Sequence, residues 1–113
     1  MRSRYAAFGA GLVDYLIDTL HPEHEDAKIE RAVLAASFQS TVTGFKYTGL
    51  RIVEADENGA DGPTVTFVAR LFTRGVDHSF AERSLFGWHE GRVLYKKGLW
   101  TRDAPGGVYD ETP

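Results

Sequence analysis

Hydrophobic and polar residues alternate with a period of two through the second half of the chain, the pattern of pleated β-strands. The clearest case is Thr64–Trp88, which predicts two long strands folded back on each other about Gly75. The same alternation predicts an earlier strand over Phe45–Ala55 and a last strand over Arg92–Trp100. Between the first two strands, the run DENGADGP at 56–63 is dense in turn-forming residues and predicts a loop.

The first third of the chain follows the helical period instead. Apolar residues three and four apart predict helices over Met1–Phe8, Leu12–Leu20 and Lys28–Phe38. Pro22 ends the second helix, and the polar, β-branched run Gln39–Thr43 predicts the exit from the third.

Three helices followed by four antiparallel strands predict an α+β fold, in which a curved sheet is covered on one face by the N-terminal helices. Long strands broken by glycine suit strong curvature, so we expect a cone whose wide mouth the helices close. A chain of 113 residues is long enough for one domain with a core. We assign 1–102 to that domain and predict that 103–113, rich in glycine, proline and acids, is a flexible tail.

Composition excludes several classes of function. The formal net charge is −3, from 13 basic and 16 acidic residues without strong segregation of sign, so we expect no nucleic-acid partner. The absence of cysteine excludes disulfides, thiolate catalysis and cysteine-ligated zinc within this chain. No apolar run approaches the length of a membrane span, so we expect no membrane partner and a cytoplasmic location.

An acid and a hydroxyl lie within an aromatic row on one face of the returning strand: Phe80, Glu82, Ser84, Phe86 and Trp88. An unpaired carboxylate there would be desolvated, which suits it to proton transfer, so Glu82 is the candidate catalytic residue. The alternative, which we favour, is a structural ion pair with Arg4 or Arg70, because a buried charge requires a partner.

The run HPEHED places His21 and His24 among acidic residues. A metal site needs three or four converging ligands, and Pro22 interrupts the helix that would align the histidines. We therefore interpret the run as a solvated turn and expect no metal and no cofactor.

Two surfaces could bind a partner. An open cone would hold a small apolar or aromatic ligand against side chains from a helix and the central strands: Tyr15, Phe67, Arg70, Glu82, Ser84, Phe86 and Trp88. On the opposite sheet face Val68, Phe72 and Leu85 could form an exposed apolar patch that makes a homodimer, unless the tail or a loop covers them.

Four stretches together resemble the YchJ-like bacterial proteins of unknown function: MRSRYAAF at the start, DYLIDTLHP at Asp14–Pro22, TFVARLF at Thr66–Phe72 and AERSLF at Ala81–Phe86. Their order and spacing agree from Met1 to about Gly98. The resemblance implies a fold similar to nuclear transport factor 2, a helix-covered curved sheet, in agreement with the cone. It supplies no catalytic residues to carry over.

The chain departs from the family pattern in two respects. Relatives typically flank this domain with cysteine-rich zinc motifs of the SEC-C type, which are missing here. The usual aromatic-rich WYY-x-DG ending is replaced by Val93–Gly98.

Two functions are compatible with these features. We favour a non-enzymatic binding or accessory module that uses the cone or the outer sheet face. The alternative is a small cofactor-independent hydrolase, isomerase or dehydratase, with Glu82 as acid/base and Tyr15 or Arg70 polarising the substrate. An arginine paired with Glu82 in a filled cone would exclude the enzyme, whereas an open cavity above an unpaired Glu82 would favour it.

Overall fold

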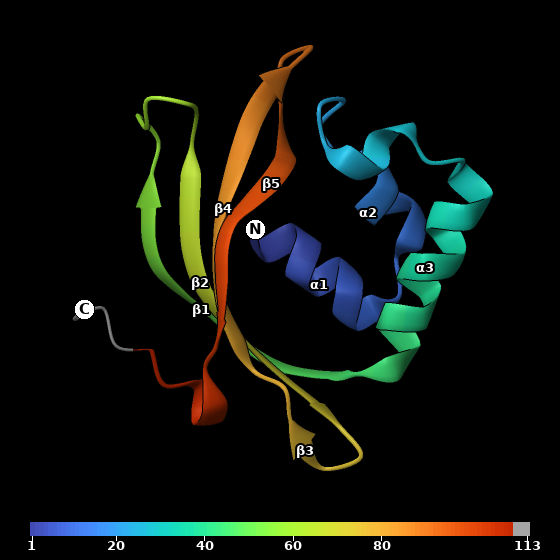
Figure 1. The fold of residues 1–113 in the computed structure, drawn as a ribbon, viewed down its shortest axis with the longest axis vertical. Helices are drawn as coiled ribbons and strands as arrows, with labels where there is room; N and C mark the ends of the chain where they lie inside the picture. The colour runs from blue at the N-terminus through green and yellow to red at the C-terminus, as the bar shows by residue number, and fades with distance from the viewer. Residues whose placement is uncertain (110–113) are drawn as a thin grey trace.

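The computed structural model describes residues 1–109, in which a curved antiparallel sheet holds the helices on its concave side (Figure 1). The helical elements are α1 (Arg2–Ala10), α2 (Val13–Asp18), α3 (Arg31–Gly44) and the short 3-10 turns η1 (Glu25–Lys28) and η2 (Pro105–Gly107). The strands are β1 (Lys46–Asp56), β2 (Thr64–Thr73), β3 (Val76–Asp77), β4 (Phe80–His89) and β5 (Arg92–Asp103).

The strand order is β1-β2-β4-β5, every pair is antiparallel, and β3 pairs with the end of β2. The predicted α+β class with an antiparallel sheet is therefore confirmed, but the sheet has five strands instead of the predicted four. The extra strand arises because the returning limb breaks at His78–Ser79, where Asp77 Oδ1 accepts the Ser79 amide at 2.8 Å. At the turn, Arg74 and Gly75 have φ of 52° and 77°, as a two-residue hairpin with two left-handed positions requires.

The main core lies between α1 and the concave face of the sheet. Phe67, Ala69 and Leu71 alternate along β2 and are buried against α1 and β1. Burying a side chain as large as Phe67 contributes about 1.5–3 kcal/mol. Tyr5 fixes the helix on this core, since its hydroxyl accepts the Gly49 amide of β1 at 2.7 Å. Figure 1 shows α1 inside the curve of the sheet, with α2 and α3 on the side of α1 that faces away from the sheet.

The third helix is longer than the sequence pattern predicted. The expected end at Phe38 is wrong, because α3 continues through the polar run 39–43 to Gly44. Thr43 remains compatible with the helix by donating its hydroxyl to the Gln39 carbonyl of the preceding turn at 2.9 Å. The polar residues lie on the solvent side of the helix, where polarity does not end it.

The segment after α2 pairs with the edge strand β5 instead of remaining helical to Leu20. The His21 amide donates to the Tyr95 carbonyl at 2.7 Å, and the Tyr95 amide donates to the Thr19 carbonyl at 2.8 Å. This short parallel bridge ties the helical layer to β5 beside the side chain of Tyr95.

The chain after β5 lies on the convex face, away from the helices (Figure 1). Ala104 is 1% exposed and packs on Val68 and Ala81, and the ring of Tyr109 stacks on Trp100. Of the tail predicted at 103–113, residues 110–113 lie outside the described part of the chain.

The apolar patch predicted on the convex face is not exposed as expected. Val68 and Leu85 are 1% and 3% exposed, while Phe72 is half-buried. The chain around Ala104 covers Val68, and Gly62 of the loop after β1 lies against Leu85. The prediction of an exposed patch is therefore wrong for these two residues, and a homodimer through this face stays a prediction.

Candidate functional site

Arg4 of α1 and Tyr95 of β5 face each other inside the curve of the sheet. Arg4 is only 6% exposed, and its guanidinium carbon lies 4.9 Å from the centre of the Tyr95 ring. Its Nη1 donates to the Leu16 carbonyl at 2.9 Å and also to the Thr19 hydroxyl. Burial lowers the pKa of Arg4 from its ordinary value, although a guanidinium stays charged at neutral pH.

Glu82 of β4 is held by hydroxyl groups. Its Oε2 accepts from Ser84 at 2.5 Å and from Tyr95 at 3.0 Å, and its Oε1 accepts from Thr101 at 3.3 Å. Gly98 of β5 leaves the room for this carboxylate, because a Cβ there would lie 3.1 Å from Oε1. Three hydroxyl donors therefore bond the two oxygens of Glu82, and no cation of residues 1–109 forms an ion pair with it.

The predicted Arg4–Glu82 ion pair is not formed, since among residues 1–109 no ion pair joins these two side chains. The Tyr95 side chain connects them instead, with its ring under Arg4 and its hydroxyl on Glu82. Arg4 reaches the carbonyl end of α2, where its Nη1 donates to neutral acceptors, so the prediction of a direct ion pair with Glu82 is wrong.

The second predicted partner, Arg70, lies on the other face of the sheet. It pairs with Asp77 at 3.8 Å and lies against Gly107 of the covering chain. The alternation of β2 decides this, because Phe67 pairs with Glu82 on the concave side and Arg70 has the opposite parity. Arg70 therefore cannot contact Glu82 or a ligand in the cone.

The electrostatics of the site keep Tyr95 neutral. Burial raises the pKa of the Tyr95 phenol first, and the negative charge of Glu82 raises it further. Tyr95 is therefore a proton donor to Glu82 over the whole physiological pH range.

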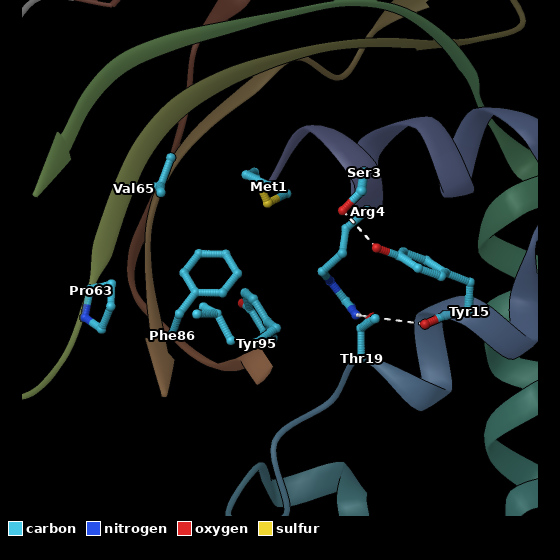
Figure 2. A pocket seen from close by; sticks show the side chains of 10 residues that line it. Met1, Ser3, Arg4, Tyr15, Thr19, Pro63, Val65, Phe86 and Tyr95 are labelled. Carbon is cyan, nitrogen blue, oxygen red and sulfur yellow. Dashed lines mark hydrogen bonds between the residues drawn. The ribbon is translucent and has the colours of Figure 1, made fainter. Parts of the chain in front are cut away.

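Two cavities open on either side of the Arg4–Tyr95 contact. The first cavity, of about 220 Å³, is lined by Met1, Ser3, Arg4, Tyr15, Thr19, Pro63, Val65, Phe86, Val93 and Tyr95. The second cavity, also about 220 Å³, is lined by Met1, Arg4, Phe8, Leu20, His24, Asp26, Phe38, Phe67, Phe80, Glu82 and Tyr95. Figure 2 shows the first cavity, with Arg4 between the helical side chains of Tyr15 and Thr19 and the strand side chains of Phe86 and Tyr95.

The predicted ligand-binding residues do not share one cavity. Tyr15 and Phe86 line the first cavity, whereas Phe67 and Glu82 line the second. Ser84 is fully buried and bonded to Glu82. Trp88 is 67% exposed at the end of β4, so it lies outside the cone. Glu82 and Tyr15 therefore line different cavities and do not surround one substrate as the enzyme hypothesis requires.

Sequence reasoning missed Tyr95, which lines both cavities. Its strand carries two bulges opposite β4, because Ser84 pairs with Gly98 and Phe86 pairs with Tyr95. A strict period of two places Tyr95 on the face of Thr101 but also places Leu99 and Lys97 there, so the period alone could not distinguish the inward side chains. The signal that could have been used is the aromatic Tyr95 itself, opposite Phe86 across the hairpin.

The side chains of both histidines in HPEHED accept backbone hydrogen bonds within turns. His21 Nδ1 accepts the Glu23 amide at 3.0 Å, and His24 Nδ1 accepts the Asp26 amide at 2.9 Å. Within residues 1–109 no three potential metal-ligating side chains come together. None of the helices in this part of the chain has the length and apolar character needed to cross a membrane.

Comparisons with known proteins agree on one family. The family model described as "YchJ, middle NTF2-like domain" matches residues 1–98. A UPF0225 protein of Deinococcus radiodurans is 37% identical over 98 residues, which cover 84% of this chain and 62% of that protein. UPF0225 proteins of Bordetella pertussis and Bordetella parapertussis are each 34% identical over 98 residues, covering 87% of this chain and 67% of each relative. No solved structure matches the chain.

Proposed function

The chain belongs to the YchJ-like family of NTF2-like domains, and we propose that it acts there as a non-enzymatic module that binds a small, largely apolar ligand in its cone. The observation that carries the proposal is the first cavity, a space of about 220 Å³ between the concave sheet and the helices. Since the chain spans only 62% of the length of the Deinococcus relative, this function is proposed for the domain and not for the longer protein.

The walls of the first cavity suit a small ligand with an apolar body. Val65, Phe86 and Val93 provide an apolar wall from three strands. Figure 2 shows Tyr15 of α2 on the other side of Arg4 from Phe86. A volume of 220 Å³ equals about seven water molecules at about 30 Å³ each. Pockets for drug-sized ligands are larger, at about 300–1,000 Å³, so we expect a compact ligand such as a single substituted ring.

The bonding of Glu82 favours binding over catalysis. A general acid or base must exchange a proton with the substrate, and both oxygens of Glu82 already accept from Ser84, Tyr95 or Thr101. Arg70 lies on the opposite face of the sheet, and Tyr15 lines the other cavity. The residues that an enzyme of this design would combine are therefore held apart.

The proposal is tested by titrating the protein with toluene and phenol while the backbone amide resonances are followed by NMR. We expect saturable shifts at Val65 and Phe86, with dissociation constants on the order of 1 mM for probes of this size. The substitution Val65→Trp should abolish the shifts by filling the first cavity. Val76→Trp, at a position that is 56% exposed on β3, is the matched control and should preserve them.

Two results would overturn the proposal. One is the absence of saturable shifts with either probe in the unaltered protein. The other is equal binding by the unaltered protein and by Val65→Trp, since the probes would then bind elsewhere.

A further inference from the structure

We propose that the ligand of the first cavity is an organic anion whose carboxylate pairs with Arg4, while its apolar body lies against Phe86. This inference rests on the proposed function and adds the charge of the ligand and the side chain that anchors it. It follows from three features of the structure: the burial of Arg4, the composition of the cavity lining and the position of Glu82.

Arg4 is a buried cation without an anion in contact. It is 94% buried, and among residues 1–109 no carboxylate oxygen forms an ion pair with it. The hydrogen bonds of its guanidinium to the described residues all use Nη1. A guanidinium carries five N–H donors in a fork that matches a carboxylate, so Nε and Nη2 retain donor capacity. Arg4 lines the first cavity, where a ligand can use those donors.

The two cavities beside Arg4 differ in charge. The second cavity has the carboxylates of Asp26 and Glu82 in its lining, whereas the first cavity has no acidic residue in its lining. Tyr95 lies between Arg4 and Glu82, so an anion in the first cavity approaches Arg4 away from the Glu82 carboxylate. The charged side chain in the lining of the first cavity is therefore that of Arg4, and its positive charge favours an anion there.

A hydroxyl next to Arg4 can add a further hydrogen bond. Tyr15 donates its hydroxyl to Ser3 Oγ at 2.7 Å, which leaves the Ser3 proton free to donate to a ligand. Ser3 and Tyr15 both line the first cavity and lie together on its helical side in Figure 2. A carboxylate placed at Arg4 would thus receive charged and neutral donors, while the Phe86 ring contacts the apolar part of the ligand.

The test compares acids with neutral molecules of the same shape. The probes are benzoate against benzamide and phenylacetate against phenylacetamide, each titrated by calorimetry at low salt and followed by the amide resonances of Ser3 and Phe86. We expect each acid to bind about tenfold or more tightly than its amide, because a hydrogen bond to a charged group is the stronger one. Added salt should lower the affinity for the acid and leave the affinity for the amide unchanged.

Two variants identify the anchor. Arg4→Gln should remove the preference for the acid, whereas Arg70→Gln, the same change of charge on the opposite face, should retain it. Folding of both is checked by circular dichroism. If Arg4→Gln does not fold, the acid and amide pairs on the unaltered protein still decide the charge of the ligand.

The remaining outcomes separate the charge of the ligand, the role of Arg4 and the cavity itself. Equal affinity for acid and amide would overturn the anionic ligand and leave the apolar cavity standing. A preference for acids that persists in a folded Arg4→Gln variant would overturn Arg4 as the anchor. No binding of any of the four probes would overturn this inference, and it would overturn the proposed function as well if toluene and phenol also fail to bind.

Discussion

Two arginines of this molecule lie on opposite faces of the same sheet and are satisfied in opposite ways. Arg70, on the convex face, pairs with Asp77 and is 40% exposed. Arg4, on the concave face, is almost fully buried, donates to a carbonyl and a hydroxyl and lies over an aromatic ring. No carboxylate of residues 1–109 forms an ion pair with it. Arg70 joins β2 to Asp77 of β3, whereas Arg4 also lines the first cavity.

The difference separates a charge that is paired with an acid from a charge that is held by neutral groups of the described chain. On the convex face Asp77 accepts hydrogen bonds from the Ser79 and Gly106 amides and forms an ion pair with Arg70, so the acid and the cation there are both partnered. On the concave face the acid, Glu82, takes hydroxyl partners, and within the described part of the chain Arg4 has no direct counter-ion. The hydrogen bonds to α2 and the contact with the Tyr95 ring stabilise Arg4 in the fold, and the proposed anionic ligand would add a counter-ion to them.

The largest effect is expected from truncating the two arginines in parallel. Arg4→Met should lower the free energy of unfolding by about 3 kcal/mol, because the Leu16 carbonyl loses a charged donor and the Tyr95 ring loses its cation. Arg70→Met should lower it by only about 0.5 kcal/mol, since its ion pair is partly exposed. Urea denaturation measures both, and equal losses would contradict the distinction between the two faces.

A smaller effect is expected from removing the charge of Glu82. Glu82→Gln should cost about 1 kcal/mol and lower the pKa of Tyr95, because the Glu82 charge is the second cause of its elevation after burial. The folded state keeps Tyr95 protonated to a higher pH than the unfolded chain does. The unaltered protein should therefore lose stability as the pH rises above about 10, and the variant should lose less.

Ultraviolet absorbance of tyrosinate during an alkaline titration follows this effect. Tyr95→Phe identifies the contribution of Tyr95 among the five tyrosines of the chain. An unchanged Tyr95 titration in Glu82→Gln would show that the carboxylate and the phenol do not interact as described.

The smallest effect at neutral pH is expected at the convex face, and it appears only in acid. Hydrogen bonds from Ser79 and Gly106 hold the pKa of Asp77 at about 2, below its ordinary value of 3.8. The stability that Asp77 contributes should therefore be complete above about pH 4 and be lost as the pH falls through 2. Asp77→Asn should remove this acid dependence and speed hydrogen exchange at the Gly106 amide, whereas Asp61→Asn, on an exposed loop, should do neither.

Local patterns were sufficient for most of the secondary structure. The period of two located the strands, and it placed Phe67 and Glu82 correctly on one face. The polar, β-branched run Gln39–Thr43 predicted the end of α3 wrongly, because Thr43 can satisfy its hydroxyl within a helix. The period of two missed β3, because a two-residue strand is too short to show a period.

The candidate site was less accessible to sequence reasoning, since its parts come together only through long-range pairing. The sequence contained Arg4 and Glu82 but not the distance between them, and the tyrosine that connects them belongs to a strand some ninety positions after Arg4. Which arginine lies near Glu82 also depended on the fold. The register that pairs Phe67 with Glu82 places Arg70, three residues after Phe67, on the other face of the sheet.

The sequence by itself determined that an acid and a hydroxyl lie within an aromatic row on one strand face, because side chains alternate along any strand. Only the tertiary structure decided how that acid is satisfied. Two bulges in β5 shift its register so that Tyr95, Gly98 and Thr101 all meet β4 on the concave side. Glu82 is then bonded by hydroxyls, and Arg4, held by the end of α2, remains available beside a cavity.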